Sequence, residues 1–360
     1  MNNLKPAVIL AAMTCFAISL NANLAGAQTT SPALLVLEKA DSTLAIADPA
    51  TMKIVARIPA GPDPHEIVVS PDGKLAYISN YGGLDSNFNT ITVIDLTTQK
   101  ALSPIQLGAL RSPHGLAFAG GKLYFTVETN KAFGRYDPAT HAIDWVLGTG
   151  QDRTHMIVVA ESLDRIFTSN VSSGTISIIE QVAGPMPPGP PPGAPAGAGP
   201  PGGPAGGPRK TWKVSEIPSG RGSEGFDLSP NGKEIWAANA QDGTVTVIDV
   251  ASKKATSTFL VSVHGNRLKF VPDGKRVLIS GGSPGGSGAN FAVIDAATHQ
   301  EIKTLNMGGG SAGILIVPDG SRVFVAIGGA NKVAAVDLQK MEVVGELPTG
   351  KGPDGLAWKN

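Results

Sequence analysis

The sequence contains almost no cysteine and has no excess of charge of either sign. Its only cysteine, Cys15, lies within the first 27 residues. If those residues are removed, no thiol remains, so neither a disulfide nor a Cys-x-x-Cys-His haem site is expected in the rest of the chain. The 29 Lys and Arg residues balance the 29 Asp and Glu residues. This balance argues against a general nucleic-acid binder, because phosphate binding needs a clustered basic surface.

Long hydrophobic runs are also scarce. The one long apolar run, 7–20, follows Lys5 and precedes the small-residue triplet 25–27 (Ala-Gly-Ala). This order predicts a cleavable secretory signal over residues 1–27, because the run is too short to be a stable membrane span. We therefore expect a periplasmic or secreted protein with no transmembrane segment in the mature chain.

What the sequence does contain is a repeat. Two β-rich runs joined by Asp-Gly or Asn-Gly, the dipeptides that favour tight hairpins, recur along the chain. The clearest copies are PHEIVVSPDGKLAYISN (64–80), GFDLSPNGKEIWAAN (225–239), LKFVPDGKRVLIS (268–280) and ILIVPDGSRVFVAI (314–327). A third run ending in an acid follows each copy, as in ITVID (91–95) and VTVID (245–249), and a fourth run comes next. Four strands per repeat of about 40–50 residues are typical of a β-propeller blade.

The repeat count predicts an all-β, seven-bladed propeller with four antiparallel strands per blade. The last inner strand, PDGLAW (353–358), has no chain after it to complete a blade, whereas Leu34–Ile58 supplies three strands with no inner strand before them. We therefore expect the N-terminal strands to pair with the C-terminal inner strand and close the ring. This assigns residues 28–360 to a single domain.

One segment breaks the repeat. Residues 183–208 are almost wholly Pro, Gly and Ala and carry no charge, which predicts a disordered loop between the third and fourth strands of one blade. It serves either as a contact for an envelope partner or as a tolerated insertion, and the sequence leaves both interpretations open.

The repeats resemble the YVTN family of seven-bladed β-propellers. The matching second strands are AYISN (76–80), IFTSN (166–170) and IWAAN (235–239), and the resemblance covers nearly all of the mature chain. It implies an exported bacterial propeller. Because relatives range from binding and surface-layer proteins to the propeller domains of redox, lactonase-like and lyase-like enzymes, the resemblance does not select an activity.

The residue that opens each inner strand is expected to face the same end of the central channel. In blade order these residues are Asp354, His65, His114, His155, Glu224, Asn266 and Ala312. Imidazole and carboxylate groups suit one divalent transition metal. One hypothesis is that His65, His114 and His155 hold the ion and that Glu224 or Asp354 is a ligand or the catalytic base. The alternative is that the ring only lines the channel.

Several arginines are expected near the same rim. They are Arg111, Arg153, Arg221 and Arg267, the last next to Asn266. Guanidinium groups present paired donors to carboxylate or phosphate, so these residues predict a small anionic ligand, unless each is a solvated loop charge. Two functions follow. The first is a monomeric module that binds such a ligand or an envelope protein at its funnel face, and the second is a metal-dependent, lactonase- or lyase-like enzyme.

Overall fold

The computed structural model describes residues 1, 32–83, 86–184, 210–283 and 288–360. The predicted signal, 1–27, and almost all of the predicted insertion, 183–208, therefore lie outside the described residues. Over the described ranges, no helix is long and apolar enough to cross a bilayer.

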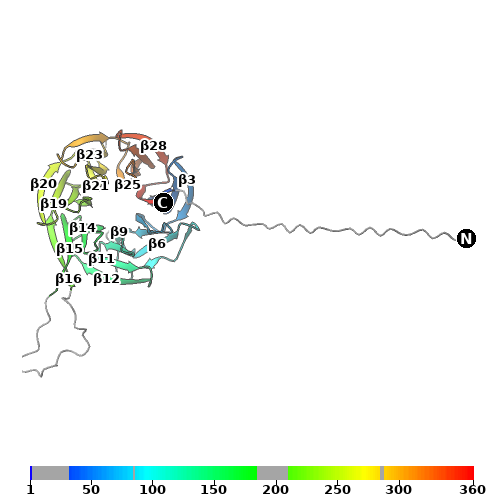
Figure 1. Cartoon of the computed structure of the whole chain (residues 1–360), viewed down its shortest axis with the longest axis horizontal. Coiled ribbons are helices and arrows are strands. Elements are labelled where there is room, and N and C mark those ends of the chain that lie inside the picture. The colour runs from blue at the N-terminus through cyan, green and yellow to red at the C-terminus, as the bar shows by residue number, and fades with distance from the viewer. Residues whose placement is uncertain (2–31, 84–85, 185–209, 284–287) are drawn as a thin grey trace, which may run out of the picture. The chain divides into compact units, whose positions relative to one another are not determined.

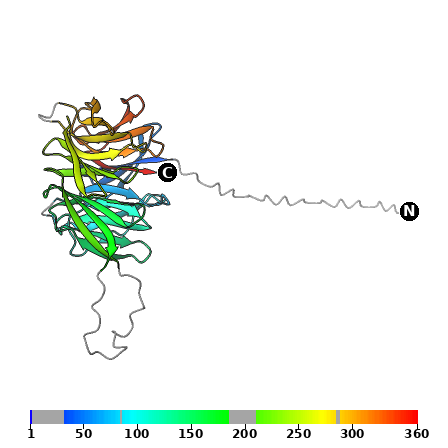
Figure 2. The same ribbon diagram turned by 60° about the vertical axis from the view of Figure 1, so that its left-hand side comes forward.

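Residues 32–360 form seven antiparallel sheets arranged around a central axis (Figure 1). Figure 2 shows the same sheets from a direction turned by 60°. The predicted seven-bladed, four-stranded architecture is confirmed.

We number the blades along the chain, starting with the one that holds both ends of the propeller. Blade 1 consists of β29 (Pro353–Lys359), β1 (Ala33–Glu38), β2 (Thr43–Asp48) and β3 (Lys53–Pro59). Blade 2 consists of β4 (Pro64–Val69), β5 (Leu75–Asn80), β6 (Thr90–Asp95), β7 (Lys100–Ala101) and β8 (Ile105–Gln106). Blade 3 consists of β9 (Pro113–Ala119), β10 (Lys122–Val127), β11 (Ala132–Asp137) and β12 (Ala142–Gly148).

The remaining blades follow the same order from the inner to the outer strand. Blade 4 consists of β13 (Thr154–Val159), β14 (Arg165–Asn170), β15 (Thr175–Ala183) and β16 (Lys210–Pro218). Blade 5 consists of β17 (Ser223–Leu228), β18 (Glu234–Asn239), β19 (Thr244–Asp249) and β20 (Lys254–Leu260). Blade 6 consists of β21 (His264–Phe270), β22 (Arg276–Gly282), β23 (Phe291–Asp295) and β24 (Glu301–Leu305). Blade 7 consists of β25 (Ser311–Ile316), β26 (Arg322–Ile327), β27 (Lys332–Asp337) and β28 (Glu342–Pro348). Two short 3₁₀ turns, η1 (Lys39–Asp41) and η2 (Gly328–Ala330), follow β1 and β26.

Two details of the strands differ from the sequence expectation. The outer strand of blade 2 is split into β7 and β8, both of which pair with β6. In blade 4, Ala183 pairs with Lys210 as the last residue of β15, so the expected start of the insertion at 183 is one residue too early. The reason is that the β15–β16 ladder continues past Ile179, since the backbone at Val182 and Ala183 still pairs with the partner strand.

The hairpin turns follow the expected backbone geometry. Gly73 and Gly274, the glycines of two Asp-Gly turns, have φ values of 69°. This left-handed region is open to glycine without steric cost, which explains why the repeat carries glycine there.

Hydrophobic packing between neighbouring blades holds the ring together. The buried apolar side chains form seven clusters, each shared by two adjacent blades. Trp236, which is fully buried, lies in the cluster between blades 5 and 6. With no disulfide expected, burial of these side chains is the main stabilising term.

Ring closure joins the two ends of the propeller. β1 pairs with β29, with Leu34 opposite Trp358. The fully buried Glu38, at the end of β1, accepts hydrogen bonds from Arg57 Nε (2.8 Å), Thr43 Oγ1 (2.7 Å) and the backbone N–H of Gly350 (2.6 Å). The carboxylate therefore ties the loop before β29 to blade 1.

Replacing Glu38 with glutamine should weaken this closure in a pH-dependent way. Burial by itself raises the pKa of Glu38, but the hydrogen bonds from Arg57, Thr43 and Gly350 outweigh burial and lower it. A lowered folded pKa stabilises the fold above the unfolded pKa, and this stability is lost as the pH falls through the folded value. We expect Glu38→Gln to cost about 1–2 kcal/mol at pH 7, and progressively less as the pH falls below about 4 through the lowered folded pKa. Urea denaturation at pH 7 and across this acidic range measures the difference, and an equal cost throughout would contradict the assignment.

Candidate functional site

The inner strands expose their opening residues through a β-bulge. The pairing register shifts between Pro64 and Ile67 in β4 and between Thr154 and Ile157 in β13. A bulge takes the residue out of the regular ladder and re-aims its side chain. His65 and His155 lie within these bulges at the channel mouth.

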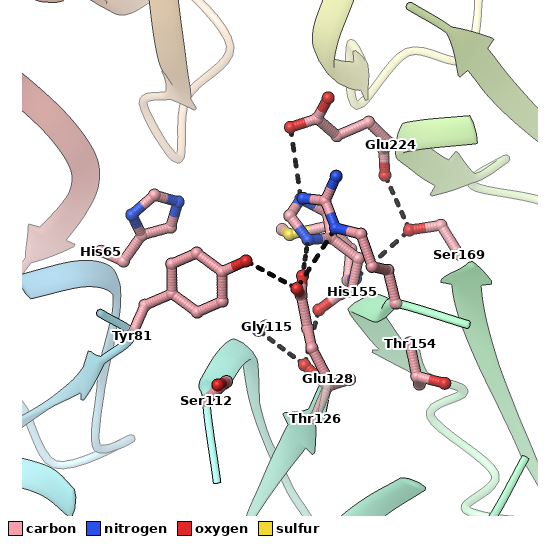
Figure 3. Close-up of polar contacts among 12 residues, drawn as sticks. His65, Tyr81, Ser112, Gly115, Thr126, Glu128, Thr154, His155, Ser169 and Glu224 are labelled. Atoms are coloured by element: carbon pink, nitrogen blue, oxygen red, sulfur yellow. Dashed lines mark hydrogen bonds and ion pairs between the residues drawn. The ribbon is translucent and has the colours of Figure 1, made fainter. Parts of the chain in front are cut away.

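Hydroxyl groups of the second strands fix the same positions. Thr126 Oγ1 accepts from the Gly115 N–H (2.8 Å) and donates to the His155 carbonyl (2.6 Å), as Figure 3 shows. In the next blade, Ser169 Oγ donates to the Glu224 carbonyl (2.7 Å). A Cβ atom at Gly115 would lie 2.5 Å from the His155 carbonyl oxygen, so only glycine lets β9 approach β13 this closely. The histidine backbones are therefore held rigidly.

Three histidines from blades 2, 3 and 4 form a row, which we call the histidine row: His65, His114 and His155. The ring centroids of His65 and His114 are 4.3 Å apart, and those of His114 and His155 are 3.6 Å apart. Tyr81 contacts both His65 (5.0 Å) and His114 (4.8 Å) through its ring. The sequence predicted that these three imidazoles face one rim, and in the structure His114 contacts the other two rings.

His114, in the middle of the row, is 0% exposed. Neither of its ring nitrogens has a hydrogen-bond partner among the residues that the structure describes. Burial, followed by the neighbouring His155 and His65, holds the pKa of His114 well below its usual value. A buried imidazole with two unpaired nitrogens is costly for a fold. It is also a neutral imidazole, which is the form that ligates metal ions.

His155 is engaged by two carboxylates. Its Nδ1 contacts Glu128 at short range, and its Nε2 lies 3.4 Å from Glu224 Oε1. Burial by itself lowers the pKa of His155, but the hydrogen bond with Glu128 and the close approach of Glu224 outweigh it and raise the pKa. Burial likewise opposes ionisation of Glu224, yet the close approach and charge of His155, then the charges of Arg267 and Arg153, set its pKa to about 2. His155 and Glu224 thus form an ion pair at the rim.

Glu128 is the centre of a network that joins three blades (Figure 3). Its side chain is fully buried, and it accepts from Tyr81 Oη (2.6 Å), Arg153 Nε (3.3 Å) and His155 Nδ1. Burial alone raises the pKa of Glu128, but the bonds and charges of His155 and Arg153 outweigh it and lower the pKa. For Tyr81, burial and the Glu128 charge both raise the pKa. Tyr81 therefore stays a hydrogen-bond donor.

At the other end of the row, His65 lies beside blade 1. Its Nδ1 contacts Lys39 Nζ and lies 3.3 Å from Asp354 Oδ2. Burial lowers the pKa of His65, although the Asp354 charge opposes the shift. Because an ammonium group only donates, Nδ1 accepts from Lys39. Asp354, expected as a ligand or base, is thus a charged neighbour of both Lys39 (3.7 Å) and His65.

A second layer lies one residue further along the inner strands. Glu66 of blade 2 accepts at short range from Arg267 Nη2 of blade 6, across the channel. Arg267 also donates to the Asn266 carbonyl (2.9 Å) and lies 3.9 Å from Glu224. Burial opposes the charge of Arg267, but Glu66, Asp354 and Glu224 outweigh burial and raise its pKa. The equivalent positions in the other blades are Gly115, Met156, Gly225, Gly313 and Gly355.

Among the residues that the structure describes, two groups of side chains have the ligand atoms for a metal ion. Those of His65, Glu66 and His114 all lie within 4.8 Å of one another, and so do those of His114, Glu128 and His155. His114 belongs to both groups. Glu128 already accepts from Tyr81, Arg153 and His155, whereas Glu66 pairs with Arg267, so the first group has the freer carboxylate.

The charge of the channel mouth favours a cation. Its carboxylates are Asp63, Glu66, Glu128, Glu224 and Asp354, and its fixed cations are Lys39, Arg153 and Arg267. Five carboxylates thus face three side chains with a permanent positive charge. Protonation of His155 would still leave an excess of negative charge. Partly buried pairs are screened weakly by salt, so this excess attracts a cation and repels a free anion.

The expected arginine cluster divides into two classes. Arg153 and Arg267 lie in the wall of the channel mouth with carboxylate partners. Arg221 pairs with Asp242 at the rim (2.6 Å) and its side chain is 78% exposed, and the exposed Arg111 donates to Asn87 Oδ1 (3.0 Å). Asn266 lies in the bulge of β21, next to Arg267. The four guanidinium groups therefore do not converge on one point.

Sequence reasoning missed four residues of this site. Lys39, Tyr81 and Glu128 each directly follow the second strand of their blade, and Glu66 directly follows a ring residue. The equivalent positions in several other blades hold Gly, Ala or Val. A polar residue at a position that is small or apolar in sister repeats is the signal that could have identified them.

Comparisons with known proteins agree with this fold. The YNCE-like β-propeller family model matches residues 4–180, slightly less than half of the chain. No curated protein matches the chain in sequence.

Solved structures of other propellers superpose on it. A functionally unknown protein from Desulfotomaculum acetoxidans aligns with a TM-score of 0.68 at 11% identity, covering 89% of this chain and 98% of that one. Hydrazine synthase from Kuenenia stuttgartiensis aligns with a TM-score of 0.61 at 19% identity, covering 82% and 89%. Dihydro-heme d1 dehydrogenase NirN in complex with DHE aligns with a TM-score of 0.60 at 16% identity, covering 90% and 74%. These identities support a shared fold and nothing finer. The chain is thus a seven-bladed β-propeller whose N-terminal half is similar in sequence to the YNCE-like β-propellers.

Proposed function

We propose that this protein is a binding module of the YVTN type that holds one divalent transition metal ion at its channel mouth. The observation that carries the proposal is His114, whose two nitrogens are buried without a partner among the described residues. Unpaired buried polar atoms in a rigid, polar site call for a ligand. Imidazole and carboxylate donors suit zinc and similar ions.

The ligands that fit best are His65, Glu66 and His114. Asp354 lies 3.3 Å from His65 Nδ1 and adds negative charge beside these ligands. Three protein ligands leave one position of a tetrahedral ion open. We further propose that the protein is exported, on the basis of the segment 1–27. We also propose that a small molecule at the open position completes the coordination of the ion.

A binding role is favoured over metal-dependent hydrolysis by the state of Glu224. A general base works best when its pKa is near the operating pH, whereas Glu224 has a pKa of about 2 because His155, Arg267 and Arg153 stabilise its charge. Such a carboxylate is a weak base. The site is therefore better suited to hold an ion and its ligand than to activate a water.

The test is zinc uptake by metal-free protein, measured by equilibrium dialysis and elemental analysis. We expect one ion per chain for the wild type, and at least about tenfold weaker binding for Glu66→Gln, since second-sphere and ligand changes commonly cost 10–100-fold. Glu342→Gln, an exposed carboxylate on the outer strand β28, is the matched control and should bind as the wild type does. Wild-type protein that takes up no zinc, copper or iron would overturn the proposal.

A further inference from the structure

Arg267 is the most deeply buried guanidinium among the arginines of the channel mouth that the structure describes. Its side chain is only 8% exposed. One end of the guanidinium faces Glu66, and Nη1 bonds the Asn266 carbonyl and lies 3.9 Å from Glu224. Its planar fork is the kind of group that recognises a carboxylate. In this state the fork is already occupied by Glu66.

The metal-free site is a poor site for an anion. A carboxylate ligand would have to displace Glu66 from Arg267. It would also enter a cluster in which five carboxylates face three permanently positive side chains. Like charges at these separations repel strongly in a partly buried site. The arginines alone therefore do not make the anion site that the sequence suggested.

A bound divalent ion removes both obstacles to an anion, namely the pairing of Glu66 with Arg267 and the excess of negative charge. Glu66 is one of the three side chains whose ligand atoms lie within 4.8 Å of one another, so its charge is neutralised by the ion instead of by Arg267. The two added positive charges also cancel the acidic excess. Arg267 then lies beside an ion with an open coordination position.

From these contacts we propose that the channel mouth binds a small carboxylate only after the metal, with the carboxylate bridging the open position of the ion and the Arg267 guanidinium. This inference rests on the metal site proposed above. Metal and carboxylate then bind with positive coupling, and each strengthens the other by the same factor. Glu66 couples the two binding events, because it leaves Arg267 when it binds the ion and so makes the guanidinium available to the carboxylate.

Acetate serves as the probe, observed by saturation-transfer NMR on the full propeller with and without zinc. We expect saturation transfer to the acetate methyl group in the zinc-loaded protein, and at least about tenfold weaker acetate binding in the metal-free protein. By the same linkage, acetate should tighten zinc binding by the same factor. Equal acetate binding with and without zinc would overturn the proposal.

Two variants locate the effect. Arg267→Lys keeps the positive charge but loses the fork, so acetate binding to the zinc-loaded protein should fall about tenfold. Glu66→Gln releases Arg267 without metal and removes one negative charge, so acetate should bind the metal-free variant more tightly than the metal-free wild type, and zinc should strengthen acetate binding less. Arg165→Gln, at the start of β14 and paired with Asp164, should behave as the wild type. Unchanged acetate binding in Arg267→Lys would contradict the role of the fork.

The outcomes separate this inference from the metal site. If the wild type takes up no zinc, both proposals fail. If it takes up one zinc ion but shows no saturation transfer to acetate, the metal site stands and the carboxylate site is wrong. The comparison of wild-type protein with and without zinc needs no variant, so a variant that fails to fold does not prevent a decision.

Discussion

Replacing His114 with leucine should stabilise the metal-free protein and abolish its zinc binding. The wild-type ring has two buried nitrogens without hydrogen bonds among the described residues, and its burial is complete. An unsatisfied buried polar group costs about 1–3 kcal/mol, so the two nitrogens together cost about 2–6 kcal/mol. Leucine removes that cost but also loses the ring contacts with His65, Tyr81 and His155. Such contacts contribute about 0.5–1.5 kcal/mol each, or about 1.5–4.5 kcal/mol together. We expect a net gain of about 1 kcal/mol in the free energy of unfolding.

Zinc should reverse this order of stability. At a free zinc concentration of 100 times the dissociation constant, binding stabilises the wild type by about 2.7 kcal/mol, whereas a variant that does not bind gains nothing. Urea denaturation of both proteins, with and without zinc, measures the reversal. His141→Asn is the matched control: His141 lies in the β11–β12 turn with φ of 54°, which asparagine tolerates, and it should leave zinc binding unchanged.

The result would contradict the assignment in either of two ways. One is a His114→Leu variant that binds zinc as tightly as the wild type. The other is a metal-free variant that is less stable than the wild type by more than about 1 kcal/mol, the typical cost of an ordinary core substitution. The second result would mean that His114 serves the packing of the channel.

Truncating Glu128 to alanine should be among the most destabilising single changes at the channel mouth. The fully buried carboxylate holds Tyr81 from blade 2 and both Arg153 and His155 from the start of blade 4. Its removal leaves a buried imidazolium and a partly buried guanidinium without their shared counter-charge. Breaking a buried ion pair on one side typically costs about 3–5 kcal/mol, and we expect a loss in this range, reduced by the partial exposure of Arg153.

Glu128→Gln separates charge from shape. The amide keeps an acceptor for Tyr81 but not the charge that stabilises His155. The free energy of unfolding of Glu128→Gln should therefore lie between the values for the wild type and Glu128→Ala. Glu342→Ala, at an exposed position of β28, should change the free energy of unfolding by no more than about 0.5 kcal/mol. Chemical denaturation of the four proteins provides the comparison. A Glu128→Ala cost below about 1 kcal/mol, the level of an ordinary hydrogen bond, would show that the network does not hold the blades.

Glu128 and Glu38 have the same structural task at different places in the ring. Glu38 joins the two ends of the chain in blade 1, and Glu128 joins blades 2, 3 and 4 at the channel mouth. Both occupy the end of a second strand or the residue after it, where the loop meets the next inner strand. Polar contacts between blades therefore concentrate at this rim, while the apolar clusters lie between the sheets.

The sequence by itself determined the architecture and the identity of the ring residues. Six of the seven blades are built from consecutive strands, and in the clearest copies the alternation, the Asp-Gly or Asn-Gly turn and the acid-terminated third strand can be recognised within about 45 residues. Counting such units predicted seven blades, the closure of β1 on β29, and one rim shared by His65, His114 and His155. Local patterns were sufficient because β-pairing is local in six blades, and the unmatched strands at the two ends of the propeller left each other as partners in blade 1.

Only the tertiary structure decided which side chains meet. Tyr81 and Glu128 are 47 residues apart, and Glu66 and Arg267 are 201 residues apart, so no local pattern connects them. The structure also separated Arg153 and Arg267, which face the channel with carboxylate partners, from Arg111 and Arg221, which face solvent. The excess of five carboxylates over three permanently positive side chains arises because loops from several blades converge on the channel mouth. Convergence of this kind is a property of the closed ring, because a single repeat contributes only one or two of the groups.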